Sequence, residues 1–314
     1  MIQISAAEVE KCLTMEACIP LMREALVALS SGKAHQVVRL AMPIEGRNLL
    51  GLMPAALLDK GISGVKVLSV FPDNAKKGLH SHQGQVLVFE NEGGSLLAAV
   101  DAGAITGVRT AAASAVATDA LALKDSPILA ILGAGLQGRQ HVSAIRQVRD
   151  IREIRVWDIR PEASQAFAKE IGAETGLPVT VCDTAHAACE NADIICTLTP
   201  AKEPIIDLAD VKPGAHINAV GACSPNAREL GGSLMGAGRV FTDWQKAALL
   251  EAGDILLAEA EGLLKKEQVA GEVGAVLTGA LEGRQNETQI TIFEALGQAT
   301  EDLMAADYIL EKIR

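Results

Sequence analysis

The sequence predicts an α/β protein in which a doubly wound parallel sheet is accompanied by a second domain of the α+β class. An apolar run at 128–132 leads directly into a glycine-rich turn, and strand-like and helix-like runs then alternate. The residues before this run instead read as a helix followed by successive strands. A chain of 314 residues is long enough to build two hydrophobic cores.

The glycine-rich turn is Gly133-Ala134-Gly135-Leu136-Gln137-Gly138. Its first glycine allows a sharp turn out of a strand, its second lets the backbone approach a pyrophosphate, and its third lets a helix pack against the strand. The amino end of that helix offers N–H groups to phosphates. These residues therefore predict a Rossmann-type dinucleotide site.

An acidic residue ends the next strand, at 154–158, and bears on the choice of cofactor. The carboxylate of Asp158 can accept both ribose hydroxyls, which favours NAD(H). Arg160 can pair with a 2′-phosphate, so NADP(H) stays open. We assign both residues, with Ile159 between them, to the cofactor site.

The alternation continues to the end of the predicted nucleotide domain. Helices are expected at 161–171 and 185–191, and strands at 179–182, 194–198, 216–221 and 239–242. Right-handed crossovers between such strands give a parallel sheet. A last periodic segment, 290–313, is expected to be a helix that returns to the first domain. We therefore predict a dinucleotide-binding domain at 118–288 and a second domain made of 1–117 together with 289–314.

The first region reads differently from the second. An amphipathic helix is expected between Thr14 and Gly32. Strand-like runs follow at 37–44, 48–55, 62–71, 83–90 and 95–100, with a hairpin turn at 92–94. Successive strands without helices between them predict an antiparallel or mixed sheet. The Ala-rich stretch 102–123 is interrupted by charged residues, so it reads as a buried helix of a soluble protein and not as a membrane span.

Charge and cysteine content limit the partners and the compartment. A net charge of −11 argues against nucleic acid and anionic membranes as partners. The six cysteines include no CxxC pair, and no basic and apolar leader is visible, which favours free thiols in a reducing cytoplasm. His80 and His82 could share a strand face, but no third ligand is evident, so no metal site is expected.

Three cationic residues lie inside apolar runs of the first region: Arg39, Lys66 and Arg109. A charge in such a run is costly to bury unless it is paired. An anionic substrate of an acidic protein needs a local cluster of this kind. A strand residue can also face solvent on the open side of its sheet, and for Arg39 this alternative is as strong as a functional one.

These residues belong to a series of motifs that resembles the ornithine cyclodeaminase/mu-crystallin family. The motifs are Gly64-Val65-Lys66, His80-Ser81-His82-Gln83-Gly84, the segment 109–114, the glycine-rich turn, the segment 217–222, and 288–293 with Gly297. They occur in order along nearly the whole chain. The family contains ornithine cyclodeaminases, alanine dehydrogenases, ketimine and pyrroline-2-carboxylate reductases, and mu-crystallins.

The resemblance implies a homodimer in which the N-terminal domain and the C-terminal helix form the interface and the substrate pocket. It implies that Arg39 and Arg109 bind the substrate carboxylate and that Lys66 acts at the reacting carbon or nitrogen. A guanidinium can clamp a carboxylate with two hydrogen bonds, and a buried ammonium can donate a proton, so the side chains suit these roles. Met53 and Cys223 are assigned to the same pocket.

The resemblance also extends the cofactor site beyond the glycine-rich turn. The added residues are Thr110, Thr197 and Thr199, and Val220, Gly221 and Ala222. Most of them lie at the ends of predicted parallel strands, and ligands of open α/β sheets lie at the carboxyl ends of the strands.

One departure from the family pattern bears on the reaction. Members that cyclise ornithine or oxidise alanine resemble one another in a catalytic Asp where this chain has Cys223. An unperturbed thiol stays mostly protonated below about pH 8.5, so it is a poor substitute for a carboxylate base. Reduction of a preformed C=N bond makes smaller demands, and mu-crystallin-like ketimine reductases also lack the acid.

We therefore expect an NAD(P)H-dependent reductase that converts a small imino acid, such as pyrroline-2-carboxylate or piperideine-2-carboxylate, to the L-amino acid. A deaminating enzyme like ornithine cyclodeaminase or alanine dehydrogenase is the nearest alternative. A non-catalytic mu-crystallin-like protein that binds cofactor and a small ligand is another. The presence of Arg39, Lys66 and Arg109 together argues against the last of these.

Overall fold

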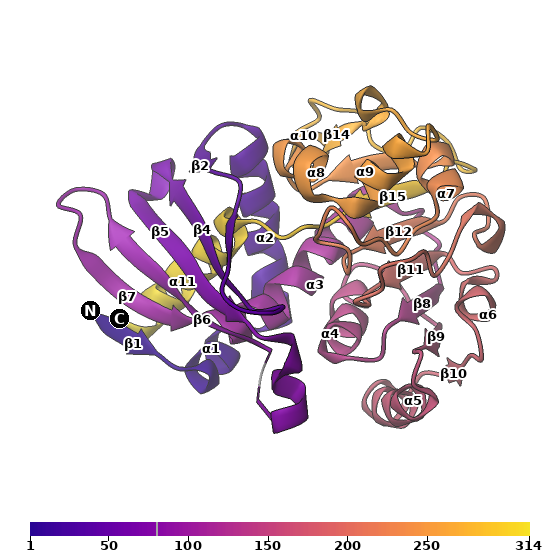
Figure 1. The fold of residues 1–314 in the computed structure, drawn as a ribbon, viewed down its shortest axis with the longest axis horizontal. Coiled ribbons are helices and arrows are strands. Elements are labelled where there is room, and N and C mark those ends of the chain that lie inside the picture. Colours follow the sequence, from indigo (N-terminus) through magenta and orange to yellow (C-terminus); the bar gives the residue numbers. More distant parts are fainter. Residues whose placement is uncertain (80) are drawn as a thin grey trace. The chain divides into compact units, whose positions relative to one another are not determined.

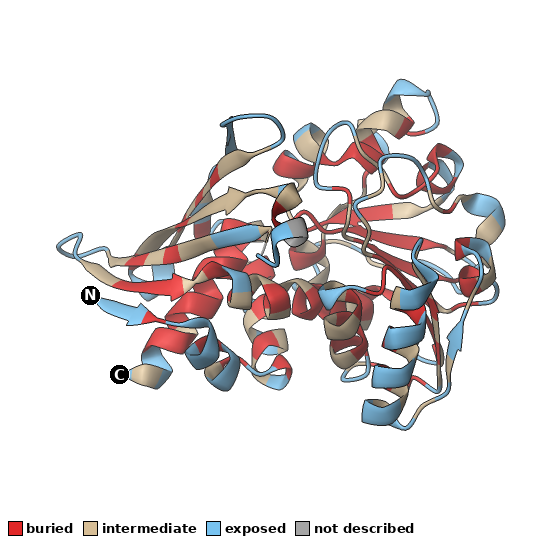
Figure 2. Cartoon of the chain, turned by 60° about the horizontal axis from the view of Figure 1, so that its bottom comes forward, coloured by how far each residue is buried: buried red, intermediate tan, exposed pale blue. Residues whose placement is uncertain are grey.

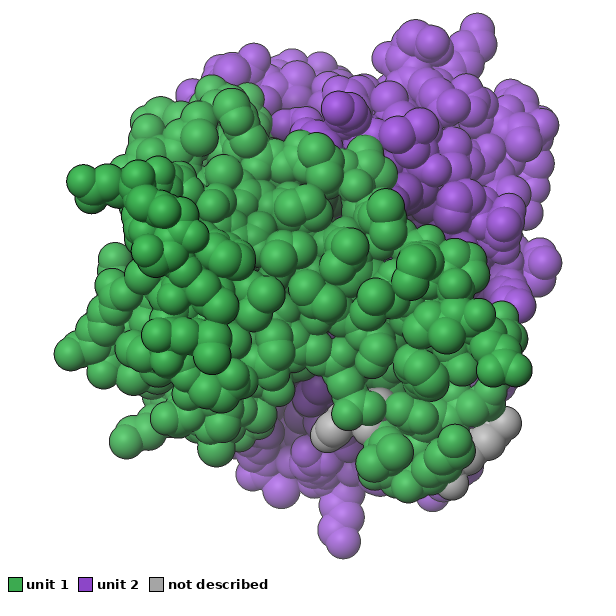
Figure 3. Space-filling model, turned by 60° about the vertical axis from the view of Figure 1, so that its left-hand side comes forward, with its two compact units in different colours: residues 1–109, 297–314 green, residues 110–296 purple. Residues whose placement is uncertain are grey.

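The computed structural model describes residues 1–79 and 81–314. The chain divides into two compact units, which Figure 3 draws in different colours. The first unit comprises 1–109 and 297–314, and the second comprises 110–296. These divisions differ from the predicted ones at 117/118 and 288/289. The observed boundary at 109/110 falls inside one continuous helix, α3 (Ala102–Leu121), in which no sequence signal marks a break.

The first unit is built on a mixed, 7-stranded sheet (Figure 1). Its strands are β1 (Ile2–Ile4), β2 (Ala34–Gln36), β3 (Leu40–Pro43), β4 (Leu49–Leu57), β5 (Ile62–Val70), β6 (His82–Glu90) and β7 (Leu96–Asp101). The order is β1-β7-β6-β5-β4-β2, with β3 paired to β4. Within 1–79 and 81–109, the described part of this unit before α11, only the pair of β1 and β7 is parallel. The prediction of an antiparallel or mixed sheet is confirmed, although β1 was not predicted.

Helices cover one face of this sheet. They include α1 (Ala6–Cys12), α2 (Met15–Ser30) and α11 (Ala299–Ile313). The hydroxyl of Thr14 caps α2 at the predicted position. Helix α11 packs on α2 and across β4, β5 and β6. At Gly64 of β5, an added Cβ would lie 2.7 Å from Leu303, so this glycine lets the helix approach the strand closely.

The second unit contains an 8-stranded sheet in which every pair of strands is parallel. Its strands are β8 (Ile128–Leu132), β9 (Glu153–Trp157), β10 (Val179–Val181), β11 (Ile194–Thr197), β12 (His216–Ala219), β13 (Arg239–Thr242), β14 (Gly271–Glu272) and β15 (Thr291–Glu294). The order is β10-β9-β8-β11-β12-β15-β13-β14. Every residue of β11, β12 and β15 is buried, and the central strands are red in Figure 2.

Short helices cross between these strands, as a doubly wound sheet requires. They are α4 (Leu136–Ile145), α5 (Pro161–Thr175), α6 (Ala185–Cys189), α7 (Gly232–Ala237), α8 (Gln245–Glu251), α9 (Gly253–Ala260) and α10 (Val273–Leu277). The predicted α/β class with a parallel doubly wound sheet is confirmed. No helix among the described residues is long and apolar enough to cross a membrane.

Two predictions about secondary structure were wrong. The segment 290–313 is not one helix, because its first part is β15, which pairs with β12 and β13. A left-handed turn at Gly297 (φ +74°) then separates this strand from α11. The run 37–44 is not one strand, because residues 37–39 separate β2 from β3. A buried parallel strand and a buried helix segment are both continuously apolar, so periodicity cannot tell them apart.

Candidate active site

The glycine-rich turn of the second unit has the shape that its sequence predicts. Gly133 has a φ of +114°, and a Cβ there would lie 2.8 Å from the Leu198 carbonyl. A Cβ on Gly138 would lie 2.5 Å from the Gly133 carbonyl, so the third glycine lets α4 pack closely on β8. A Cβ on Gly135 would meet nothing within 4 Å. The backbone is therefore open at the position where a pyrophosphate would approach, and these residues fit a dinucleotide.

The amino end of α4 adds a second feature that suits an anion. The helix begins at Leu136, and Gly135 has no side chain with which to cap it. Its first N–H groups and its dipole therefore face outward from an uncapped end. Leu136 at this end of the helix is 60% exposed, whereas Val142 and Ile145 further along it are buried.

Asp158 ties the end of β9 to the glycine-rich turn. Its Oδ2 accepts from the Ala134 N–H at 3.0 Å, and its Oδ1 accepts from the Arg160 N–H at 3.0 Å. The Arg160 side chain is 65% exposed and also contacts this carboxylate, at 3.3 Å. Ile159 between them is exposed. Asp158 and Arg160, the acid and the cation that are predicted to affect the choice of cofactor, are thus in contact at the end of β9.

Glu229 joins two strand ends that the sequence assigned to the cofactor. Its Oε1 accepts from the Thr199 N–H and Oγ1, both at 2.6 Å, and its Oε2 accepts from the Gly221 N–H at 2.8 Å. A Cβ on Gly221 would lie 2.5 Å from Oε2, so this glycine makes room for the carboxylate. Thr199 and Gly221 follow β11 and β12. One buried side chain therefore fixes both segments.

A second buried acid holds Glu229 in turn. Asp254 of α9 accepts from the backbone N–H groups of Glu229 and Leu230, at 2.9 and 2.7 Å. Burial raises the pKa of Glu229, against the effect of its hydrogen bonds from Thr199. Burial also raises the pKa of Asp254, to about 7. The strand ends of the second unit are thus held by carboxyl groups that have little access to water.

In the first unit, Lys66 is buried on the face of β5 that α11 covers. It is 4% exposed and lies directly across from Met53 of β4, which is also buried. Its Nζ donates to Thr106 Oγ1 at 2.6 Å and to both oxygens of Asp302, at 3.0 and 3.1 Å. The expectation that a charge in this apolar strand must be paired is confirmed.

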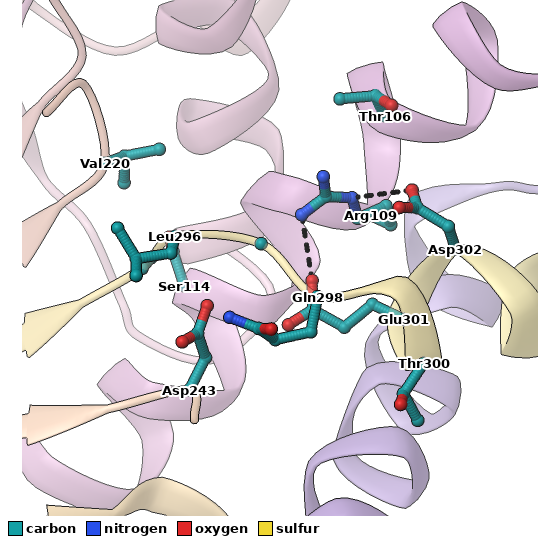
Figure 4. A network of polar contacts seen from close by, with 12 residues as sticks. Thr106, Arg109, Ser114, Val220, Asp243, Leu296, Gln298, Thr300, Glu301 and Asp302 are labelled. Atoms are coloured by element: carbon teal, nitrogen blue, oxygen red, sulfur yellow. Dashed lines mark hydrogen bonds and ion pairs between the residues drawn. The ribbon is translucent and has the colours of Figure 1, made fainter. Parts of the chain in front are cut away.

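Arg109 shares the same acidic partner (Figure 4). Its Nε donates to Asp302 Oδ1 at 3.1 Å, and its Nη1 donates to Glu301 Oε2 at 2.9 Å. Both acids lie in the first turn of α11, where the helix dipole favours negative charge. Asp302 is fully buried and Glu301 is 1% exposed. One helix end therefore holds two buried cations from α3 and β5.

Arg39 reaches the same helix end from the segment between β2 and β3. It is half-buried, and its Nη2 donates to the Gly297 carbonyl at 3.1 Å. A Cβ on Gly297 would lie 2.7 Å from Nη2 of Arg109, so both guanidinium groups lie against this residue. The alternative in which Arg39 merely faces solvent on an open sheet is wrong. The first unit thus gathers the three predicted cations where α11 begins.

Burial and neighbouring charges adjust Lys66. The pKa of Lys66 is lowered to about 8, mainly by burial. The charge of Asp302 raises this pKa, and the charges of Arg109 and Arg39 lower it further. An amine with such a pKa can both hold and release a proton near neutral pH.

The sequence profile of the ornithine cyclodeaminase/mu-crystallin family matches residues 1–314. The chain belongs to this family. It is 37% identical over 313 residues to the ketimine reductase mu-crystallin of Mus musculus, covering 98% of this chain and 96% of that protein. It is 33% identical to a delta(1)-pyrroline-2-carboxylate reductase of Bacillus cereus, covering 99% and 96%. The resemblance inferred from the motifs is confirmed.

Solved structures of family members have the same fold. The delta(1)-pyrroline-2-carboxylate reductase of Thermococcus litoralis, in complex with NADH and L-proline, matches with a TM-score of 0.96 and 34% identity over 99% of this chain and 97% of that one. An archaeal alanine dehydrogenase dimer with bound NAD matches with a TM-score of 0.94 and 30% identity, over 99% and 95%. The family therefore includes both reductases and dehydrogenases on this fold.

The position where some family members have an acid is held here by Cys223, just after β12. Cys223 is exposed, and its thiol donates to the Val220 carbonyl at 3.3 Å. In the second unit it also lies 3.8 Å from the Leu296 carbonyl.

Sequence reasoning missed three acidic residues: Glu229 in the second unit, and Glu301 and Asp302 in the first. Their signal was weak, since acids are common in loops and in the first turn of a helix. Of the histidine pair weighed as metal ligands, His80 lies outside the described residues. Among the residues that are described, no group of His, Cys, Asp and Glu could hold a metal ion.

Proposed function

We propose that the chain is an NAD(P)H-dependent reductase that converts a small imino acid to the L-amino acid. The observation that carries the proposal is the pair of buried cations, Lys66 and Arg109, on one carboxylate of α11. A carboxylate-binding guanidinium beside an ammonium that can release a proton is what an imino acid requires. The relatives named ketimine reductase and pyrroline-2-carboxylate reductase, at 37% and 33% identity, support this substrate class.

Each group has a defined task in the proposed reaction. A bound nicotinamide cofactor supplies the hydride. Arg39 and Arg109 bind the substrate carboxylate, and a planar guanidinium can do so with two parallel hydrogen bonds. Lys66 Nζ donates a proton to the imine nitrogen, which makes the C=N carbon more electrophilic. Met53, across from Lys66, offers an apolar contact to the substrate side chain.

The proposed cofactor is NAD(H), with NADP(H) as the second candidate. The open backbone at Gly135 and the uncapped end of α4 support a dinucleotide. Neighbouring structures that contain NADH or NAD support the same choice. Asp158 favours NAD(H), whereas the exposed Arg160 allows a 2′-phosphate. Thr110, Thr197, Val220 and Ala222 remain proposed cofactor contacts.

The first test is oxidation of NADH and NADPH, followed at the nicotinamide absorbance. The substrates are pyrroline-2-carboxylate, piperideine-2-carboxylate, and pyruvate with ammonia or methylamine. Rapid oxidation with a cyclic imine is expected, and it also shows which cofactor is preferred. Ammonia release from ornithine or alanine without imine reduction would instead mean a deaminating enzyme. Cofactor binding without any turnover would mean a non-catalytic binding protein.

The role of Lys66 is tested by the Lys66→Ala variant. Loss of the proton donor is expected to lower kcat by about 10²-fold or more, since general acid catalysis contributes on this order. A folded Lys66→Ala protein with parental turnover would remove Lys66 from the reaction. The first unit would then need another proton donor.

We also propose that the chain forms a homodimer through the uncovered face of the first-unit sheet. This is the face opposite the one that α11 covers. Its half-buried apolar residues are Leu52, Pro54, Val65, Leu87 and Phe89. A hollow of about 400 Å³ on this surface includes Pro54, Val65 and Phe89 in its lining. Continuous apolar surface of this kind favours association. The dimer named for the archaeal alanine dehydrogenase supports the proposal.

Light scattering during size-exclusion chromatography tests the dimer. Val65→Asp places a charge in the proposed interface and is expected to give monomers. Val181→Asp is the control, because Val181 is 38% exposed on the edge strand β10. A monomeric parent protein, or a dimer that survives Val65→Asp, would contradict the proposal.

All six cysteines are free thiols, which agrees with the proposed reducing cytoplasm.

A further inference from the structure

We infer that Asp302 is a positioning residue of the proposed reaction, which keeps Lys66 in its ammonium form and aligns it with Arg109. The inference rests on the proposed function and adds a residue that no sequence motif indicated. Its basis is a single buried carboxylate that binds both cations.

The contacts give Asp302 a more specific place than a general ion pair would. Both of its oxygens accept from Lys66 Nζ, and Oδ1 also accepts from Arg109 Nε. Glu301, the preceding residue, accepts from Nη1 of the same guanidinium. The two cationic groups are therefore fixed relative to each other through one side chain. A shift of this carboxylate would move the proton donor and the carboxylate clamp together.

The cluster around Lys66 contains one more cationic group than acidic groups, and the negative charge of a substrate can balance this excess. Cations come from β5, α3 and the segment before β3, and acids come from the start of α11. The groups are Lys66, Arg109 and Arg39 against Asp302 and Glu301. Two further titratable groups, His82 of β6 and Cys18 of α2, interact with these charges: desolvation and the charge of Lys66 lower the pKa of His82, and burial raises the pKa of Cys18 to about 12. A substrate carboxylate would balance this cluster.

Without Asp302, Lys66 would lose the charge that offsets its burial. Burial and the charges of Arg109 and Arg39 all lower the pKa of Lys66, and Asp302 is the acid that opposes them. Neutralising Asp302 would therefore lower this pKa below about 8. Lys66 would then be a neutral amine at the pH where the parent protein still carries the proton.

The proton balance of the step needs Lys66 charged and Asp302 unchanged. Hydride from the reduced cofactor forms the new C–H bond, and the cofactor is oxidised. The Nζ–H bond of Lys66 breaks as the N–H bond of the amine forms, so Lys66 is left neutral. A proton from water restores it before the next turnover. Asp302 takes no part in the proton transfer and acts only through its contacts with Lys66 and Arg109.

The decisive experiment is the pH profile of kcat/KM for Asp302→Asn, expressed as a ratio to the parent with the same imine. The ratio cancels the ionisation of the imine itself. We expect kcat/KM of the variant to be about 10²-fold below that of the parent at pH 8. The loss should become smaller as the pH falls, because Lys66 of the variant becomes protonated again at lower pH. A loss that is the same at every pH, or no loss, would overturn the inference.

Asp307→Asn is the matched control on the same helix. Asp307 pairs with Lys60 at 3.3 Å, outside the cluster of cations. The kcat/KM of this variant, divided by that of the parent, is expected to stay near one at every pH. If Lys66→Ala keeps parental turnover, the proposed function fails. If Lys66→Ala is inactive while Asp302→Asn follows the parent, only the inference fails.

A second variant covers the case in which Asp302→Asn does not fold. Asp302→Glu keeps the charge and moves it by one methylene group. We expect a lower kcat with an unchanged pH profile and an unchanged KM for the cofactor, because alignment is disturbed and protonation is not. A parental kcat in this variant would show that the position of the carboxylate is unimportant.

Discussion

Gly297 lies directly against the guanidinium of Arg109, and a Cβ on this glycine would come within 2.7 Å of Nη2. Its φ of +74° belongs to the left-handed region, which disfavours other residues. Gly297, the first residue of the chain's return to the first unit, thus also decides where a proposed substrate-binding group can lie.

The Gly297→Ala variant is expected to displace Arg109 and raise the KM for the imino acid. Backbone strain at the positive φ should lower the free energy of unfolding by about 1–3 kcal/mol as well. Gly61→Ala is the control, because Gly61 has a φ of +65° with nothing near its Cβ. It should show the stability loss alone. Equal KM values in the two variants would contradict the contact.

The Glu229→Gln variant is expected to weaken NADH binding without unfolding the protein. The amide keeps one acceptor but presents an NH2 group toward a backbone N–H, so either Thr199 or Gly221 is released. Loss of a charge-assisted hydrogen bond of 1.5–3 kcal/mol corresponds to about a tenfold or greater rise in the dissociation constant. Titration by NADH fluorescence measures it, with Glu261→Gln as a surface control. An unchanged dissociation constant would argue against the role of Glu229.

The Arg160→Ala variant is expected to lower kcat/KM with NADPH more than with NADH. The guanidinium is 65% exposed and able to turn toward a 2′-phosphate, whereas NADH has no such group. The change in the ratio of the two cofactors is expected to be about tenfold. Parallel assays at one ionic strength give this ratio. If it does not change, Arg160 does not bind the phosphate.

The buried acid Asp254 predicts a pH-dependent difference in stability. Its pKa is about 7 in the folded protein against 3.8 for an ordinary Asp, so the folded state binds the proton more tightly. Stability contributed by the protonated form is present below pH 3.8 and is lost as the pH rises toward 7. The Tm of Asp254→Asn relative to the parent should therefore rise over this range. Thermal unfolding at several pH values checks this, and a constant difference would contradict it.

The glycine-rich turn of the second unit was easier to predict from the sequence than the charge pairing in the first unit. The glycine-rich turn is contiguous, and each glycine has a local steric reason that can be recognised from spacing alone. Burial of Lys66 and Arg109 could also be predicted, because a charge within an apolar run must find a partner. The identity of the partner could not, since Asp302 follows Arg109 by 193 positions and nothing in its own neighbourhood distinguishes it.

The error at 290–313 has the same origin. Ile292 and Leu296 lie at helical spacing, yet Ile292 belongs to a parallel strand that is buried on both faces. Only the neighbouring strands, which come from distant parts of the sequence, decide between the two structures. Glu229 was missed for a related reason, because its role depends on two strand ends that meet only after the sheet has formed.

The order of the elements along the chain has a consequence for synthesis on the ribosome, because α11 follows the whole second unit. The buried cations of the first unit emerge early, but the carboxylates that neutralise them belong to residues 301 and 302 of 314. The second unit, 110–296, is complete before α11 is made. During translation the second unit can therefore reach its native state first. The buried cations of the first-unit sheet receive their counter-ions only when α11 has been made.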